Sequence, residues 1–355
     1  MFQVKLSRSL DNPLSKSNNF DLLRFVFAFI VCLVHAHTLS GVGDMAVFSR
    51  IFSSEIAVKC FFVVSGFLIF MSYENSKSIK AYFIKRLRRI YPAYFLMVLL
   101  CVLMGALFST YSTRDYWLSF AVLKYLAANL TFLNFIQPTL PGVFENNSYQ
   151  AVNGALWTLK IEVMFYLAVP LIVAMSRKFQ RLPVLIGLYI CSVFYSLWMI
   201  KLHQVTGLNL YLELQRQLPG QLTYFIAGAA GFYYHEYFKQ YQRHLIIVAI
   251  IAFCLKALLP WIAVEPIALA IAVVYFACIF QCVGNFGKYG DFSYGVYITH
   301  FPILQLLISF GLFKTFSWIT FAGAVSLILL VSALFWNFIE KPFLRKSSHY
   351  VAVSK

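Results

Sequence analysis

Apolar residues occur along this chain in runs of about 20, and short segments that hold most of the charged residues separate the runs. A run of that length forms a helix long enough to cross the ~30 Å hydrocarbon core of a bilayer. The pattern predicts ten membrane-spanning helices, at about residues 22–39, 56–73, 92–110, 155–175, 183–200, 219–237, 245–259, 264–283, 291–310 and 318–338. We therefore expect an all-α, polytopic membrane protein.

The composition supports this fold class. Of 355 residues, 61% are hydrophobic and 12% are charged, whereas soluble domains carry about 25% charged residues. The seven cysteines lie in or beside apolar runs and form no CxxC pair, so the sequence predicts neither a disulfide framework nor a metal site. The polar N-terminus has no cleavage-site pattern, and we expect the first apolar run to remain as a helix.

The formal net charge of +16 has a topological explanation. An excess of Lys and Arg can indicate nucleic-acid binding, but in a polytopic protein these residues collect in the cytoplasmic loops. Placing the N-terminus in the cytoplasm puts most of them on that side. We therefore expect both termini in the cytoplasm, contacts with membrane lipids and no nucleic-acid partner. The chain, 1–355, is predicted to form one transmembrane domain with short tails at about 1–20 and 339–355.

Residues 116–135 test this topology, because they are apolar enough to be considered an additional span. A span there would invert every later loop and place Arg177, Lys178 and Arg181 outside, against the usual bias of basic residues. We therefore interpret the segment as an interfacial or re-entrant helix on the external face. The loop after it, 136–154, is expected to be external.

The first candidate site lies in the first span. Arg24 and His35 are eleven residues apart, which places them within about 20° of the same helix face and ~16 Å apart along the axis. Asp21 lies one turn before Arg24 and can pair with it. Arg24 can alternatively snorkel to the membrane surface, and His35 can make a packing hydrogen bond. Ionisable residues deep in a span are costly and usually functional, which favours a functional role for His35.

A second candidate site is the basic segment at residues 80–95. Arg86 and Arg89 are spaced i, i+3 and share a helix face. A cytoplasmic loop would attract basic residues in any case, so topology alone is the alternative explanation. Arginine also suits forked contacts with phosphate oxygens. The cluster therefore indicates a phosphate-rich cytoplasmic ligand such as coenzyme A.

A carboxylate marks the third site. Glu162 lies several residues inside the predicted span over 155–175, and Tyr166 follows one turn later. A carboxylate in a membrane needs a partner, which we expect on another helix. An interhelical salt bridge and a catalytic or acceptor-binding role both remain open.

The fourth site lies at residues 292–304, where Ser293, Tyr297 and His300 follow spacings of four and three and can share a face. Only His300, near the middle of the membrane, stands above ordinary packing. The pair Ser65–Gly66 in the second span indicates close helix packing rather than a nucleophile.

Together these segments resemble the bacterial membrane-bound acyltransferase family 3, the O-acetyltransferases of O-antigen, exopolysaccharide and related sugars. The resemblance runs from Asp21 to Pro342. It rests on Arg24–x10–His35, FFVVSGFLI, Arg86–x–x–Arg89, Trp157…Glu162…Tyr166…Pro170, SYGVYITHFPI and the closing FIEKP. The ordered set at these spacings is specific.

The resemblance implies ten core helices and an acyl-CoA donor, such as acetyl-CoA, that is taken up from the cytoplasm. It also implies a carbohydrate acceptor, cell-surface or lipid-linked, at the inner membrane of a bacterium. Some members carry a further helix and an SGNH-type esterase domain, for which this chain has no room, so a stand-alone member is expected. The expected roles are catalysis for His35 and Glu162, donor binding for Arg24, Arg86 and Arg89, and support for Asp21, Tyr166, Tyr297 and His300.

Two mechanisms and two other functions remain open at this stage. His35 can act as a general base on the sugar hydroxyl or as a nucleophile that forms an acyl-histidine. The main alternative function is a transporter of a glycan or a proton-coupled solute, with Glu162, His35 and His300 as a proton relay. The arginine cluster and the lack of internal repeats argue against it. A binding or sensory protein is the third possibility, and the sequence leaves the acyl group, the sugar and the oligomeric state undetermined.

Overall fold

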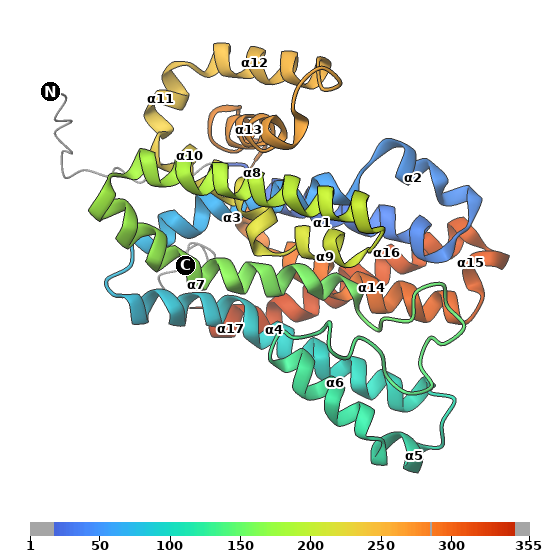
Figure 1. The fold of residues 1–355 in the computed structure, drawn as a ribbon. Helices are drawn as coiled ribbons and strands as arrows, with labels where there is room; N and C mark the ends of the chain where they lie inside the picture. Colours follow the sequence, from blue (N-terminus) through green and yellow to red (C-terminus); the bar gives the residue numbers. More distant parts are fainter. Residues whose placement is uncertain (1–17, 285, 345–355) are drawn as a thin grey trace, which may run out of the picture.

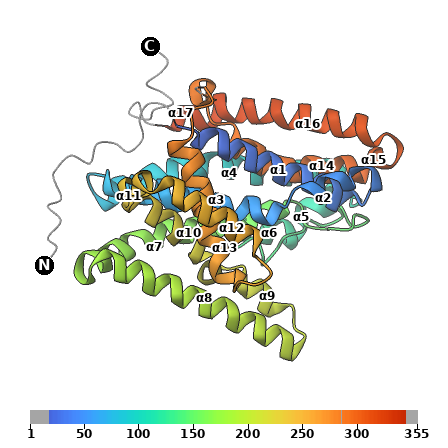
Figure 2. The ribbon, with the colours of Figure 1, turned by 90° about the horizontal axis from the view of Figure 1, so that it is seen from above.

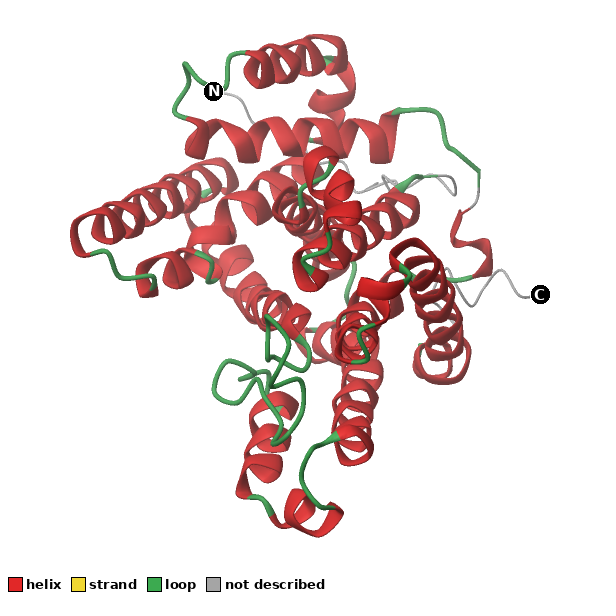
Figure 3. Ribbon diagram, turned by 90° about the vertical axis from the view of Figure 1, so that its right-hand side faces the viewer, coloured by secondary structure: helices red, strands yellow, loops and turns green. Residues whose placement is uncertain are grey.

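The computed structural model describes residues 18–284 and 286–344, and in these residues the regular structure is helical (Figures 1 and 3). Each of the ten predicted spans corresponds to a helix. These helices are α1 Phe20–Ser40, α3 Ser54–Glu74, α4 Ile79–Phe108, α7 Trp157–Phe179, α8 Arg181–Thr206, α10 Leu218–Tyr233, α12 Gln242–Cys254, α13 Trp261–Val274, α14 Ser293–Ser309 and α16 Ser317–Leu334.

Short helices and turns connect these elements. They are Gly43–Met45, α2 Ala46–Ile51, α5 Thr113–Leu118, α6 Phe120–Leu130, Gly154–Leu156, α9 Leu210–Gln215, α11 His235–Gln240, Tyr275–Ile279, Phe286–Tyr289, α15 Leu312–Thr315, Phe335–Glu340 and α17 Lys341–Phe343. The turns Tyr275–Ile279 and Phe335–Glu340 are π-helical and continue α13 and α16. The predicted tails, 1–20 and 339–355, lie largely outside the described residues.

The prediction of a polytopic, all-α membrane protein is confirmed. Seven helical segments of the described chain are long and apolar enough to cross a membrane, and they contain α1, α3, α4, α7, α8, α13 and α16. The other three, α10, α12 and α14, have 16, 13 and 17 residues.

Two predicted boundaries are wrong. We expected Lys256 inside a span, but α12 ends at Cys254 and Lys256 lies in the turn that follows. The third span is also longer than predicted, because α4 runs for 30 residues and includes the basic segment before Pro92. Ser78 caps this helix by accepting a hydrogen bond from the amide of Ala81, which satisfies one of the free amides at the helix start.

Residues 116–135 do not form a spanning helix. They contribute to α5, of 6 residues, and α6, of 11 residues, which are separated at Ser119. Both are far shorter than the roughly 20 residues that a span requires. The loop 131–153 that follows has left-handed backbone at Phe132, Gly142 and Phe144.

The centre of the bundle depends on close backbone packing between α3 and α10. A Cβ atom on Gly66 would collide with the carbonyl group of Phe225, and one on Gly228 would collide with that of Val63. Small residues let membrane helices approach in this way and gain dispersion contacts. The predicted role of Gly66 in close packing is confirmed.

The edge of the bundle carries apolar side chains. Helix α8 lies at one side of the molecule, opposite α16 (Figure 2). At intervals of four residues it exposes Leu182, Ile186, Ile190, Phe194 and Trp198. This spacing forms one continuous helix face, which lipid would cover in a bilayer.

The predicted topology has a direct test. We expect Ser148→Cys, in the exposed part of the loop 131–153, to react with a membrane-impermeant maleimide in intact cells. Lys77→Cys, in the short loop between α3 and α4, should react only after permeabilisation. Both substitutions are made in a background that lacks the exposed Cys191 and Cys254. Labelling of Lys77→Cys but not of Ser148→Cys in intact cells would show that the true topology is the inverse of the predicted one.

Candidate functional site

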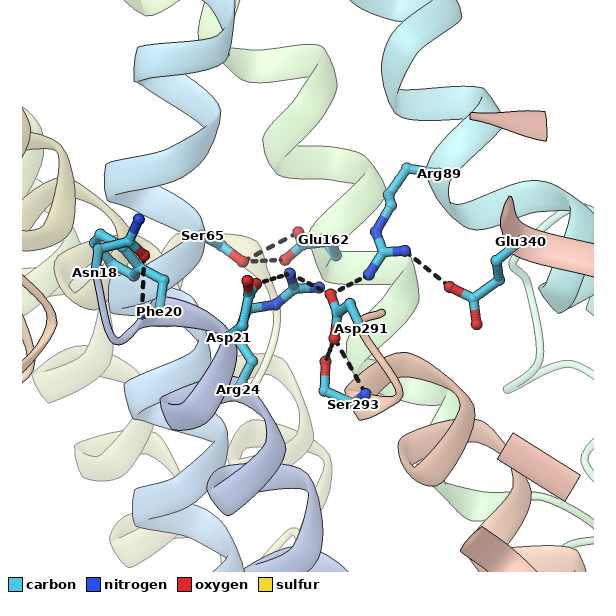
Figure 4. A network of polar contacts seen from close by, with 10 residues as sticks. All are labelled: Asn18, Phe20, Asp21, Arg24, Ser65, Arg89, Glu162, Asp291, Ser293 and Glu340. Carbon is cyan, nitrogen blue, oxygen red and sulfur yellow. Dashed lines mark hydrogen bonds and ion pairs between the residues drawn. The ribbon is translucent and has the colours of Figure 1, made fainter. Parts of the chain in front are cut away.

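Four helical segments meet in a network of charged side chains (Figure 4). Arg24 of α1 and Arg89 of α4 both form ion pairs with Oδ2 of Asp291, which lies just before α14. Arg89 also donates from Nη1 to Oε2 of Glu340, at 2.8 Å. Asp291 and Glu340 are only 1% and 2% exposed as side chains. The network therefore connects α1, α4, α14 and the end of α16.

Asp291 stays ionised in this setting. Burial by itself raises the pKa of its carboxyl, but the two neighbouring guanidinium groups outweigh burial and bring the pKa of Asp291 below its ordinary value. The backbone amide and the hydroxyl of Ser293 both donate to Oδ1. Asp21, the partner expected for Arg24, is more distant, at 3.9 Å from the Arg24 Nη1 atom.

Arg86 lies in a different environment from Arg89. Its Nη2 atom donates to Ser72 Oγ at 3.0 Å, and its guanidinium lies 5.8 Å from the ring centre of Tyr166. Its buried Nε atom has no hydrogen-bond partner. Among the described residues no carboxylate lies within ion-pair distance of Arg86. The two arginines predicted to act together are therefore in different electrostatic states.

A cavity adjoins this network. Its wall includes Arg24, Arg89, Ser293, Glu162 and Tyr166. Apolar and aromatic side chains form much of the remainder, namely Val58, Phe61, Phe62, Ile90, Leu159, Tyr294 and Tyr297. The cavity wall thus combines a few charged and polar groups with a largely apolar and aromatic lining.

Glu162 has the interhelical partner that a membrane carboxylate requires, but the partner is not a cation. The hydroxyl of Ser65 in α3 lies 3.0 and 2.9 Å from the two carboxylate oxygens. No salt bridge to Glu162 occurs in the part of the chain that the structure describes. Tyr166 is placed by Tyr82, whose hydroxyl donates to the Tyr166 carbonyl oxygen at 3.1 Å.

His35 and His300 meet between α1 and α14. The Nδ1 atom of His35 lies 2.9 Å from Nε2 of His300, and the rings stack at 23° with centroids 5.1 Å apart. Nδ1 of His300 lies 3.1 Å from the carbonyl oxygen of Val296 in the preceding turn. His300 is fully buried, whereas His35 is half-buried.

Tyr297 contacts both the cavity and His300. It is part of the cavity wall, and its ring centre lies 5.9 Å from that of His300. Its hydroxyl is 2.8 Å from that of Thr158, and Phe61 packs edge-on against its ring. Of the predicted residues, Arg24, Arg89, Glu162, Tyr166 and Tyr297 therefore share the cavity wall, while His35 and His300 lie beyond it.

Sequence reasoning missed Asp291, Thr158 and the roles of Ser65 and Glu340. Glu340 stands in the closing FIEKP motif, and Asp291 lies two residues before the SYG segment that begins at Ser293. A buried Asp beside a helix start and a Glu inside an apolar run are the signals that could have identified them. Ser65 and Thr158 offer no such signal, because hydroxyls are common in membrane helices.

The fold and the cavity define a polytopic membrane protein with a cavity whose wall is partly ionic and largely apolar. Residues 17–337 match the model of a family described as an acyltransferase domain, and the chain belongs to this family, acyltransferase family 3. It is therefore an acyltransferase.

Two relatives match over nearly their full length. The chain is 28% identical over 360 residues to "Nodulation protein 10" of Rhizobium leguminosarum bv. viciae, covering 94% of this chain and 95% of that protein. It is also 28% identical over 348 residues to the "O-acetyl transferase" of Shigella phage Sf6, covering 94% and 98%.

A third relative matches in part. The "Peptidoglycan O-acetyltransferase OatA" of Listeria monocytogenes is 29% identical over 165 residues, which are 42% of this chain and 24% of that protein. No solved structure matches the chain.

Proposed function

We propose that this protein transfers an acetyl group from cytoplasmic acetyl-CoA to a hydroxyl of a carbohydrate, cell-surface or lipid-linked, at the inner membrane of a bacterium. The observation that carries the proposal is the cavity, whose wall offers both the cationic groups and the apolar surface that the two ends of an acyl-CoA require. The acyltransferase family supplies the reaction type. The relatives described as an O-acetyl transferase and a peptidoglycan O-acetyltransferase support an acetyl donor and a glycan acceptor.

The donor would bind with its nucleotide at the end of the bundle where Arg24, Arg86 and Arg89 lie. Arg86 is the best placed of the three to hold a phosphate, because its charge has no carboxylate partner and its buried Nε atom has no acceptor. Leaving such a donor unsatisfied is costly. Arg24 and Arg89, which line the cavity, would form its entrance around the narrower pantetheine arm.

The thioester would approach His35 from the inner end of the cavity. Tyr297 and Phe61 line the cavity and pack against each other, and in this proposal their side chains move apart for the arm to pass. The acceptor would approach from the opposite membrane face, near the loop 131–153. Glu162 lies in the cavity wall beside the path of the arm and would contact the donor.

Two chemical routes start from the same atom of His35. In one, Nε2 takes the proton of the sugar hydroxyl, the oxygen bonds to the thioester carbon, the C–S bond breaks, and the thiolate receives the proton. In the other, Nε2 bonds to the acyl carbon and the C–S bond breaks to release the thiolate. The sugar oxygen then bonds to the acyl carbon, the C–N bond to histidine breaks, and the hydroxyl proton passes to the thiolate. Both routes give an O-acyl sugar and free CoA.

Comparison of cells with and without the gene tests the overall function. Mass spectrometry of surface glycans and lipid-linked intermediates should show an increment of one or more acetyl groups only where the protein is present. Membranes from the expressing cells, given [¹⁴C]acetyl-CoA, should transfer the label to the glycolipid fraction. Glycans of identical mass in both strains, with no transfer of label, would contradict the proposal.

Arg86 gives a test of the donor site. Arg86→Ala should raise the KM for acetyl-CoA by about 10- to 100-fold, because a charge-assisted hydrogen bond is worth about 1.5–3 kcal/mol. Arg86→Lys should recover only part of this loss, since an ammonium lacks the planar fork of guanidinium. Arg88, two residues on and exposed, provides the control. An equal KM for Arg86→Ala, Arg88→Ala and wild type would mean that Arg86 does not bind the donor and only favours the cytoplasmic position of this segment.

A further inference from the structure

The hydrogen bonds of the histidine pair determine where each proton lies. A carbonyl oxygen can only accept, so Nδ1 of His300 must donate to the carbonyl of Val296. In a neutral imidazole the other nitrogen is then an acceptor. Nε2 of His300 therefore accepts, and the proton in the 2.9 Å contact between the rings belongs to Nδ1 of His35.

The protonation of the second nitrogen atom of His35 follows from that of the first. Since its Nδ1 atom carries the proton, its Nε2 atom carries a lone pair. No hydrogen-bond partner of this Nε2 atom is found among the described residues. Both rings are neutral in this setting, because no carboxylate pairs with either of them in the described parts of the chain. An unpaired imidazolium in an apolar interior would be costly.

We propose that His300 is a positioning residue that holds His35 in the tautomer with an unprotonated Nε2 atom, ready to accept a proton or bond to carbon. This inference rests on the proposed function of His35. It serves both chemical routes, because the base and the nucleophile need the same lone pair. The carbonyl group of Val296 in α14 thereby determines, through the ring of His300, which nitrogen atom of His35 in α1 is reactive.

The pair also supports His35 after the step. When Nε2 takes the proton of the hydroxyl, His35 becomes a cation whose Nδ1–H still donates to the neutral ring of His300. Hydrogen bonds to a charged donor are about twice as strong as neutral ones, so the contact strengthens as charge develops. The proton then leaves with the CoA thiolate, and the pair returns to its starting state.

A bond that merely joins α1 to α14 is the competing explanation, and the two can be separated by choice of side chain. The amide of Gln reaches about as far as Nε2 of histidine, so His300→Gln can still accept from His35. The shorter amide of Asn reaches only as far as Nδ1, so His300→Asn can keep the bond to Val296 but not the bond to His35. His300→Phe keeps the ring volume and loses both bonds.

Thr299→Val is the matched control. Thr299 is 1% exposed, and its hydroxyl donates to the carbonyl of Gly295 in the preceding turn, as His300 does to that of Val296. It therefore reports the cost of removing one buried polar bond from α14. Amounts of each variant in the membrane are measured by size-exclusion chromatography in detergent.

Membranes containing each variant are assayed with [¹⁴C]acetyl-CoA and the glycolipids of the host strain. We expect kcat to fall by about 100-fold in His300→Phe and His300→Asn, the lower end of the effect of losing a general base. His300→Gln should retain activity within about tenfold of wild type, with the KM for acetyl-CoA unchanged in all three.

The outcomes separate this inference from the proposed function. Inactive His35→Gln together with fully active His300→Phe and His300→Asn would overturn the positioning role and leave His35 in place. Equal losses in His300→Gln, His300→Asn and Thr299→Val would reduce His300 to a packing residue. Activity in His35→Gln itself would instead contradict the proposed role of His35.

Discussion

Replacing His35 with Gln is expected to lower glycan acetylation by about two to four orders of magnitude, the range that general acid–base catalysis contributes. Gln keeps a polar amide at about the distance of Nε2 but can neither take up a proton nor bond to an acyl carbon. The amount of folded protein and the binding of acetyl-CoA should change little, because His35 lies beyond the cavity wall that would hold the donor. Transfer of label from [¹⁴C]acetyl-CoA to glycolipid measures the effect.

His37 offers a control on the same helix. Its Nδ1 atom lies 2.7 Å from Ser49 Oγ in α2, near the end of α1, and it makes no contact with His300. His37→Gln should therefore acetylate at nearly the wild-type rate. Comparable rates for His35→Gln and His37→Gln would make both structural histidines. If only His35→Gln is inactive, trapping wild-type protein with [¹⁴C]acetyl-CoA and no acceptor would show whether label stays on histidine.

Hydrophobic periodicity was sufficient to predict the helices but not their ends. Runs of about 20 apolar residues are a direct consequence of bilayer thickness, and a helix occurs at each of the ten predicted positions. Helix ends depend on weaker local signals. Helix α4 continues back through Lys85 and Arg88 to Ile79 because charged side chains are good helix formers that extend into water.

The candidate site was only partly predictable for a different reason. A charged residue in an apolar run is visible at once, so Arg24, His35, Glu162 and His300 could be selected individually. Their partners could not, because they come from distant parts of the chain. Asp291 pairs with Arg24 across more than 250 residues, and no local pattern encodes such a contact.

The different surroundings of Arg86 and Arg89 could not be predicted from the sequence for the same reason. The i, i+3 spacing placed both on one face of α4 correctly, but a face spans several neighbours. Arg89 meets Asp291 and Glu340, whereas Arg86 meets Ser72 and Tyr166. Two arginines only three residues apart on one helix therefore differ in whether a carboxylate forms an ion pair with them.

Asp291→Asn should destabilise the protein by about 3–5 kcal/mol, the typical cost of removing one partner from a buried ion pair. Asn has nearly the shape of Asp but no charge, so Arg24 and Arg89 would face each other with one fewer anion between them. Both guanidinium groups are largely buried, at 20% and 13% side-chain exposure, so water would compensate little. Thermal unfolding in detergent should show a clear decrease in Tm.

The same chemical change at the surface provides the comparison. Glu213 pairs with Arg216 in an exposed i, i+3 contact, and Glu213→Gln should change stability by no more than about 0.5 kcal/mol. Removing one of the opposed cations should also relieve the defect, so Arg24→Gln combined with Asp291→Asn should be more stable than Asp291→Asn alone.

Because the pKa of Asp291 lies below its ordinary value, the carboxylate is ionised throughout the neutral range, and its stabilising effect is lost only as the pH falls through that lowered pKa. If Asp291→Asn has the same Tm as wild type, Arg24 and Arg89 do not depend on Asp291 for their stability. This part of the cavity wall would then be held by packing and not by charge.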